Sequence, residues 1–201
     1  MSGSIFDTVR DLVSMKERGE ILFVSDFSHL NDDLAVTKML SRLVHEERLE
    51  RIANGIYLKA KRTDFGSLIP SLDEIAHAIA RRDKVKIFPS GNTALSMLGL
   101  TTQVPMVAEY ITTGSPRTIK IGKRKIVFYN STPKNFEYKN EVIHLVVVAM
   151  KKIGQKNIRD EDIEVIERLL SDKNIEYWKE DIQLAPVWIR KIITETIEKA
   201  D

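Results

Sequence analysis

The segment that decides the fold is NDDLAVTKMLSRLVHEERLERIANGIYLK, residues 31–59. Its first half repeats apolar residues at helical spacing, so that one side of a helical wheel carries Val36, Met39, Leu40 and Leu43. Its second half has two short runs of alternating apolar and polar residues joined by Asn54-Gly55. This dipeptide is the strongest local signal for a β-hairpin with a type I′ turn, whose two central residues both require positive φ. We therefore expect a helix to about Glu46, capped by Asn31 or Asp32, and then a tight hairpin.

Two further helices are predicted before this segment. Apolar residues at helical spacing over residues 4–16 indicate an amphipathic helix, capped by Ser4 or Ser2 and ended by Gly19. The apolar run 21–24 then leads into a helix of one or two turns that ends near Asn31. Three helices followed by a tight hairpin is the element order of a winged helix-turn-helix domain, which we place at residues 1–62.

The outer face of the third predicted helix is short, polar and basic. Side chains of this kind can donate to phosphates and base edges from a major groove, and they are Thr37, Lys38, Ser41 and Arg42. The hairpin would add contacts to phosphate or to the minor groove through Arg48, Arg51, Asn54 and Lys59. A protein-interaction role stays open, because winged helices also serve as interaction modules. Asp32 and Asp33 would repel phosphates, although they complement the helix dipole.

The near-neutral net charge of +2 hides an uneven distribution along the chain. Residues 81–139 hold 11 basic and three acidic side chains, whereas residues 1–64 hold 10 and 11 and residues 140–201 hold 10 and 13. The middle of the chain is therefore basic, between neutral and acidic flanks, and this pattern favours a nucleic-acid partner.

Three strands are predicted in this basic segment, at residues 108–112, 117–121 and 125–129, and they are expected to form a small antiparallel meander. Cations gather around its second turn: Arg117, Lys120, Lys123, Arg124 and Lys125. Such a cluster is either a solvated hairpin tip that protects a sheet edge or a second nucleic-acid contact.

The rest of the chain predicts a mixed α/β domain over residues 63–201. Helices are expected at 71–82, 93–98, 142–152, 158–170 and 186–199, and a strand at 85–88. The fold class is thus α+β, with an N-terminal winged helix-turn-helix, a small antiparallel sheet and C-terminal helices.

Few residues point to catalysis. The chain has no cysteine, which removes disulfides and thiolate chemistry, and its four histidines lack the spacing of a metal site. Glu137-Tyr138-Lys139 matches the E-x-K tripeptide of metal-dependent nucleases, which also need a second acidic residue nearby. Ser90-Gly91 before a short helix is either an anion cradle or an ordinary cap. We expect no enzyme activity, catalytic residue, metal or cofactor, and keep a metal-dependent nuclease as an alternative.

No membrane contact is expected. Asp7 interrupts the N-terminus before a secretory signal could form, and the uncharged window 87–108 contains prolines and glycines that suit a loop better than a membrane span. The sequence therefore predicts a cytoplasmic protein.

Several short motifs resemble those of the AbiEi-type antitoxins of bacterial type IV toxin–antitoxin and abortive-infection systems. The similarity covers roughly residues 5–200 and rests on three groups of residues. They are Leu49, Arg51 and Gly55-Ile56-Tyr57; Pro89-Ser90-Gly91 with Leu98-Gly99-Leu100-x-x-Gln103-x-Pro105; and Tyr110-Ile111-Thr112 with Gly114, Arg117, Ile119 and Gly122.

The resemblance implies an autorepressor whose winged helix binds inverted repeats in double-stranded DNA upstream of its own operon. It also implies a C-terminal domain that counteracts a nucleotidyltransferase-like toxin, typically without a tight complex between the two proteins. In that family, positive surface on the C-terminal domain has been associated with operator binding, which favours nucleic-acid contact by the Arg117–Lys125 cluster. We predict a DNA-binding autorepressor that is also an antitoxin, with a protein-interaction adaptor and a nuclease as alternatives.

Overall fold

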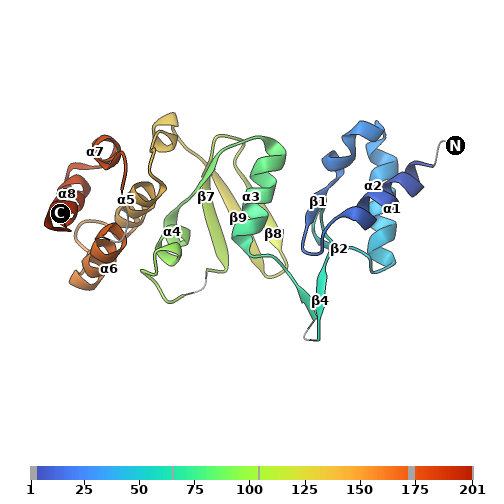
Figure 1. The fold of residues 1–201 in the computed structure, drawn as a ribbon, viewed down its shortest axis with the longest axis horizontal. Helices are drawn as coiled ribbons and strands as arrows, with labels where there is room; N and C mark the ends of the chain where they lie inside the picture. The colour runs from blue at the N-terminus through green and yellow to red at the C-terminus, as the bar shows by residue number, and fades with distance from the viewer. Residues whose placement is uncertain (1–3, 65, 104, 172–174, 201) are drawn as a thin grey trace. The chain divides into compact units, whose positions relative to one another are not determined.

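The computed structural model describes residues 4–64, 66–103, 105–171 and 175–200, and it is a mixed α+β fold with small antiparallel sheets (Figure 1). The chain divides into two compact units. Unit 1 comprises residues Met1–Lys84 and Ile119–Lys125, and unit 2 comprises Val85–Thr118 and Ile126–Asp201. None of the helices described is long and apolar enough to cross a membrane.

Unit 1 begins with the three predicted helical segments. Helix α1 spans Ile5–Met15 and is capped by Ser4, whose Oγ accepts from the N–H of Phe6 at 3.2 Å; Ser2 lies outside the described residues. Strand β1 spans Ile21–Phe23, and the 3₁₀ segment η1 spans Val24–Leu30. Helix α2 spans Asp33–His45, and Asp32 is its cap, accepting from the N–H of Ala35 at 2.9 Å. The predicted helices are confirmed.

The predicted hairpin is also present, but its turn differs from the expected type. Strands β2 (Glu50–Ala53) and β3 (Ile56–Leu58) pair antiparallel in a sheet of order β1-β3-β2. Only Gly55 of the two turn residues has positive φ, at 69°, so the expected type I′ turn is wrong. The register shifts between Arg51 and Ala53, and this irregularity supplies the local twist that a type I′ turn would otherwise provide.

The core of this part of unit 1 lies between the helices and the three-stranded sheet. The apolar stripe predicted on α2 is buried, with Val36, Leu40 and Leu43 each 0% exposed. It packs in one cluster with α1, η1 and the sheet: Val9, Val13, Leu22, Phe27, Met39, Leu49 and Tyr57. Burial of this stripe fixes which face of α2 remains in water.

A second hairpin follows that the sequence pattern did not predict. Strands β4 (Lys61–Thr63) and β5 (Gly66–Leu68) form a separate two-stranded sheet, and Arg62 joins it to the turn before β2 by donating to the carbonyl of Glu47 at 3.0 Å. Helix α3 (Leu72–Asp83) then ends the first segment of unit 1. A capping box between Ser71 and Glu74 starts α3, and the hydrogen bonds from Ser71 lower the pKa of the Glu74 carboxyl.

A four-stranded sheet follows, with strands β6 (Ile87–Pro89), β7 (Val107–Thr112), β8 (Arg117–Ile121) and β9 (Arg124–Asn130). Its order is β6-β7-β9-β8, so the expected meander is wrong: β9 lies between β7 and β8. Strand β9 buries Ile126 and Phe128, whereas β8 carries Arg117 and an exposed Lys120. Each strand carries two cations, but the more apolar strand takes the inner position and the other strand the edge. Helix α4 (Gly91–Met97) joins β6 to the loop before β7.

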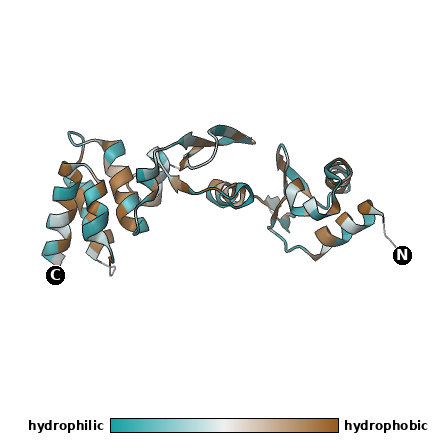
Figure 2. Cartoon of the chain, turned by 90° about the horizontal axis from the view of Figure 1, so that it is seen from above, coloured by the Kyte–Doolittle hydropathy of each residue, from teal (hydrophilic) through white to brown (hydrophobic). Residues whose placement is uncertain are grey.

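The C-terminal part of unit 2 is helical. It contains η2 (Pro133–Phe136), α5 (Glu141–Ile153), α6 (Asp160–Ser171), α7 (Trp178–Asp181), η3 (Ile182–Leu184) and α8 (Val187–Ala200). Figure 2 shows that these helices carry hydrophilic and hydrophobic residues together, as amphipathic helices do. Their buried residues form one core with α4, against which Trp178 and Trp188 pack. The predicted helices here are confirmed.

Candidate nucleic-acid interface

The exposed face of α2 carries four of the thirteen residues proposed from the sequence as DNA contacts. Thr37, Lys38 and Arg42 are exposed and Ser41 is half-buried. The hydroxyl of Thr37 donates to the carbonyl of Asp33 at 2.7 Å, and Arg42 pairs with Glu46 at 2.8 Å. Within the described part of the chain, Lys38 takes part in no ion pair. Its ammonium is therefore available to an external anion.

Leu34 lies on the same face of α2, and the sequence pattern did not single it out. Its side chain is 66% exposed, although it stands in the first turn of a helix that buries four other apolar residues. On the helical wheel Leu34 lies opposite Val36 and beside Lys38 and Ser41, and this position is the signal that could have identified it. The face of α2 thus offers an apolar contact beside its hydroxyls and cations.

The β2–β3 hairpin brings two of the remaining predicted residues together. A nitrogen of the Arg51 guanidinium donates to Oδ1 of Asn54, so the side chain of Arg51 is held along the turn. Both residues are exposed, as is Arg48 before the hairpin. The hairpin therefore presents the guanidinium of Arg51 in a fixed position, and the exposed side chain of Arg48 precedes it in the chain.

Lys59 has a different role from the one its sequence position indicated. Its Nζ donates to the carbonyls of Val13 at 2.9 Å, Ser14 at 2.7 Å and Lys16 at 2.6 Å. These carbonyls lie at the C-terminal end of α1, where a cation complements the helix dipole. An ammonium has three N–H donors, and all three are used here. Lys59 therefore caps α1 and has no donor left for a phosphate.

The cations of the middle segment gather at the turn between β8 and β9. Gly122 has φ 58°, as the first central residue of a type II′ turn requires, and Lys123 is the second. Lys120, Lys123 and Lys125 are exposed and Arg124 is half-buried, and none of them joins an ion pair among the described residues. We call these four residues the hairpin cluster.

Arg117 lies at the far end of β8 from this turn. Its guanidinium carbon is 5.4 Å from the centre of the Phe128 ring, in cation–π geometry. The five cations that the sequence groups together therefore divide into the hairpin cluster and one arginine that packs on the sheet.

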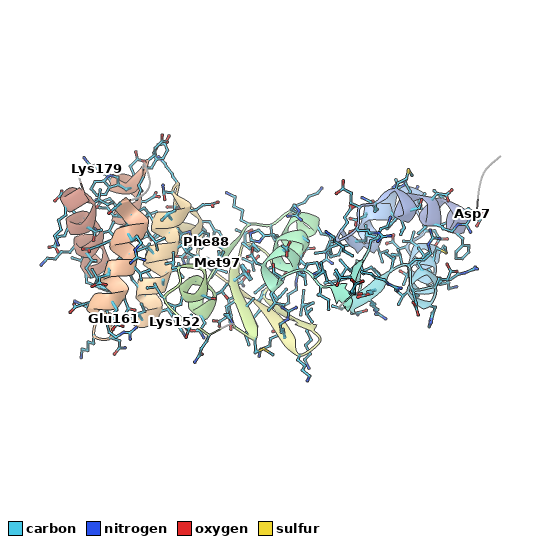
Figure 3. All side chains as sticks on the ribbon, turned by 60° about the horizontal axis from the view of Figure 1, so that its bottom comes forward. Asp7, Phe88, Met97, Lys152, Glu161 and Lys179 are labelled. Carbon is cyan, nitrogen blue, oxygen red and sulfur yellow. The ribbon has the colours of Figure 1, made fainter. Side chains whose placement is uncertain are left out.

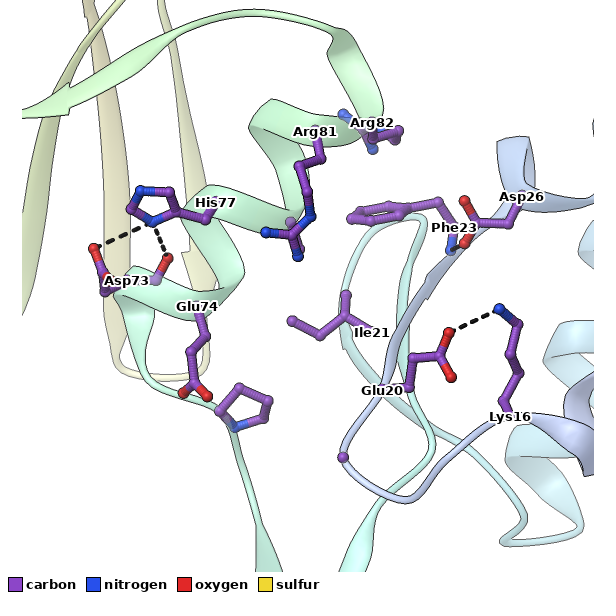
Figure 4. Close-up of a pocket in the computed structure, with 13 residues that line it drawn as sticks. Lys16, Glu20, Ile21, Phe23, Asp26, Asp73, Glu74, His77, Arg81 and Arg82 are labelled. Atoms are coloured by element: carbon purple, nitrogen blue, oxygen red, sulfur yellow. Dashed lines mark hydrogen bonds and ion pairs between the residues drawn. The ribbon is translucent and has the colours of Figure 1, made fainter.

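A groove of about 770 Å³ lies within unit 1, between the β1 segment and α3 (Figure 4). Its charges are of both signs and largely paired. Lys16 bonds Glu20 at 2.7 Å, which raises the pKa of Lys16, and the Arg82 guanidinium lies 4.7 Å from the centre of the Phe23 ring. Nothing in the described part of the chain groups three metal-binding side chains. The groove therefore lacks the single-signed charge that would attract a nucleic acid.

The residues weighed for a nuclease are engaged elsewhere. Lys139 forms an ion pair with Glu180 through its ammonium, and its backbone N–H donates to the buried carboxylate of Asp181 at 3.0 Å. Glu137 is exposed at the end of η2. This arrangement joins α7 to the start of α5 and positions no carboxylate pair for a metal among the described residues.

The carboxylate of Glu109 lies against the turn before α4. Oε2 of Glu109 accepts from the N–H of Asn92 at 3.2 Å, and Oε1 accepts from the hydroxyl of Tyr129 at 3.2 Å. A Cβ added to Gly91, whose φ is 54°, would lie 2.3 Å from Glu109 Oε2. The left-handed φ of Gly91 favours glycine here, and the Glu109 carboxylate lies against this turn.

Comparison with protein-family models matches residues 8–178 to a model described as "Family of unknown function (DUF6088)". Comparison with curated proteins gives no match. The matched range includes the α2 face, the β2–β3, β4–β5 and β8–β9 hairpins and most of unit 2.

Proposed function

The chain belongs to the DUF6088 family of unknown function, and we propose that it is a regulator that binds duplex DNA through the exposed face of α2. The observation that carries the proposal is this face itself. Burial of Val36, Leu40 and Leu43 turns Lys38 and Arg42 to solvent on a regular helix. A helix of this size fits the major groove, where cations and hydroxyls can reach phosphates and base edges.

The surrounding elements support interpreting residues 1–62 as a winged helix-turn-helix. Helices α1 and α2 with η1 between them precede the β2–β3 hairpin, and β1 completes a three-stranded sheet. In this interpretation α2 is the recognition helix and β2–β3 is the wing. Arg48, Arg51 and Asn54 then contact the backbone or the minor groove.

Individual contacts follow from the chemistry of each side chain. Lys38 and Arg42 can bind phosphate or the guanine edge, and the hydroxyl of Ser41 can bond to either group. Leu34 suits the methyl group of thymine, the apolar feature of the major groove. Lys59 has no place in this interface because its three donors are used within the protein.

The hairpin cluster supplies the charge that the α2 region lacks. Residues 1–64 hold 10 basic and 11 acidic side chains, so α2 and its wing attract DNA only weakly at long range. We propose that Lys120, Lys123, Arg124 and Lys125 bind phosphates without reading sequence.

The biological role rests on the resemblance to the AbiEi-type antitoxins. We propose a cytoplasmic autorepressor that binds inverted repeats upstream of its own operon and counteracts a nucleotidyltransferase-like toxin. Expression of the adjacent reading frame with and without this protein tests the second part. Restored growth on co-expression supports an antitoxin, and growth arrest that this protein does not relieve contradicts it.

DNA binding is tested by fluorescence anisotropy with the DNA upstream of the gene. The double variant Lys38→Ala, Arg42→Ala should weaken binding to this DNA about tenfold or more and reduce its preference over scrambled DNA. The control is Lys61→Ala, Lys156→Ala, which removes two exposed lysines that belong neither to α2 nor to the hairpin cluster. Equal losses in the two double variants would reduce the effect to net charge and contradict a recognition role for α2.

The hairpin cluster predicts a different signature. Replacing Lys123, Arg124 and Lys125 by Gln should weaken binding to upstream and scrambled DNA by the same factor. It should also lower the slope of log K against log salt by up to about 2.7, at roughly 0.9 for each phosphate that the protein no longer neutralises. An unchanged slope would assign the cluster to protection of the sheet edge.

A further inference from the structure

A groove in unit 2 is lined by apolar side chains and by two lysines. Its volume is about 310 Å³. Ile111 of β7 and Val148 of α5 contribute apolar surface, and the polar residues around them are Ser90, Asn135, Lys151 and Lys152. Figure 3 labels Lys152 at the C-terminal end of α5. No function proposed above uses this groove.

Positive charge gathers at the groove, and none of its lining residues is acidic. Burial lowers the pKa of the Lys151 ammonium, and the neighbouring charge of Lys134 lowers it further. Among the described residues, Lys134, Lys151 and Lys152 form no ion pair. Cations that repel one another across a concave surface lower their energy when an anion binds between them.

The side of α5 that leads to the groove carries a buried histidine. His144 is 4% exposed and lies one turn before Val148 and two turns before Lys151. Its ring is stacked 3.5 Å from the ring centre of Phe88 and 4.2 Å from that of Tyr138, and its Nε2 has no hydrogen-bond partner among the described residues. Burial lowers the pKa of His144 to about 3, and the charge of Lys151 contributes in the same direction. The charge of Lys151 is therefore uncompensated on this side as well.

The polar groups at the rim can complete the binding of an oxyanion. The hydroxyl of Ser90 has no hydrogen-bond partner within the part of the chain described, while Asn135 is held by its bond to Ser131 Oγ at 2.7 Å. Glu109 of the neighbouring strand does not itself line the groove, but its carboxylate lies against Gly91, which does. Its carboxylate accepts from the N–H of Asn92 and the hydroxyl of Tyr129.

We propose that this groove binds the phosphate group of a small phosphorylated ligand. Lys151 and Lys152 bind the phosphate oxygens, with Lys134 adding long-range attraction, and the Ser90 hydroxyl donates a hydrogen bond. Ile111 and Val148 contact the part of the ligand next to the phosphate. The inference does not depend on DNA binding by α2.

The test is a calorimetric titration of the full chain with inorganic phosphate, AMP and dimethyl phosphate. AMP represents a free phosphate monoester and dimethyl phosphate the diester of a nucleic-acid backbone. Saturable binding of AMP assigns the groove to phosphate monoesters and supports the proposal. Preferential binding of dimethyl phosphate assigns it to a backbone diester and contradicts a small-ligand site, and no saturable binding of any of the three probes overturns the proposal.

Single substitutions test whether phosphate binds in this groove. Lys151→Gln and Lys152→Gln should each weaken phosphate binding about tenfold, the effect of losing one charge-assisted hydrogen bond. Lys156→Gln removes an equal charge from an exposed turn outside the groove and should leave binding unchanged. NMR titration of the Lys151 side chain should show its pKa rising when phosphate is added. Equal effects of all three variants, or an unchanged Lys151 pKa, would place the anion elsewhere and contradict the proposal.

Discussion

Replacing Lys59 with Met should destabilise the protein without changing its affinity for DNA. Methionine keeps the aliphatic length of the side chain and removes the ammonium that binds the carbonyls of Val13, Ser14 and Lys16. The bonds to Val13 and Lys16 are partly buried and the bond to Ser14 is exposed, so water can replace the last one most easily. At roughly 1–1.5 kcal/mol for each partly buried bond, the free energy of unfolding should fall by about 2–3 kcal/mol.

Urea unfolding followed by far-UV circular dichroism measures this loss. Trp178 and Trp188 both lie in unit 2, so tryptophan fluorescence in the same samples reports on that unit alone. The control is Lys61→Met, which removes an exposed lysine from β4. Equal stability of the two variants would refute the capping role. A large loss of DNA affinity in folded Lys59→Met would show that Lys59 contacts DNA after all.

Three further substitutions test contacts inside unit 2. The pKa of His144 is about 3 in the folded state and near 6.5 in the unfolded state, so the unfolded state takes up a proton first as the pH falls. The contribution of neutral His144 to the free energy of unfolding is therefore complete above pH 6.5 and is lost as the pH falls. In urea unfolding the wild type should lose roughly 2 kcal/mol between pH 7 and pH 5, and His144→Phe should lose clearly less. Equal acid sensitivity would contradict the low pKa. Gly91→Ala should lower the free energy of unfolding by about 1–2 kcal/mol because of the left-handed φ, and by a further amount because of the contact with Glu109. A smaller loss in a Glu109→Ala background would confirm that contact, and an equal loss would exclude it. Asp181→Asn should lower the free energy of unfolding by about 1–3 kcal/mol, because the buried carboxylate accepts from the N–H groups of Lys139 and Asn140. An unchanged urea transition, followed by tryptophan fluorescence, would show that these bonds are dispensable.

Local patterns predicted α1, α2 and α3 well because each has an amphipathic stripe and a side-chain cap. Ser4, Asp32 and Ser71 all cap the helices expected to follow them. The β4–β5 hairpin was missed because Lys61-Arg62-Thr63 is fully polar, without the alternation that marks a half-buried strand.

The sheet order and several side-chain roles depend on contacts that are distant in sequence. The placement of β9 between β7 and β8 follows from competition among strands for the buried position, which no single segment reveals. Lys59 reaches carbonyls 43 to 46 residues earlier in the chain, so its position on a predicted wing was a misleading guide to its contacts. Leu34, by contrast, could have been identified from the sequence, because on a helical wheel it lies opposite the buried stripe.

The measurement that tests the central claim most directly is the ratio of affinities for the DNA upstream of the gene and for scrambled DNA of the same length and composition. It is best made near 150 mM salt, where non-specific phosphate contacts are weakened. A recognition helix that reads base edges predicts a ratio of about 10³ or more. A ratio near one, with the protein folded and at any affinity, would contradict the claim that the exposed face of α2 recognises a DNA sequence.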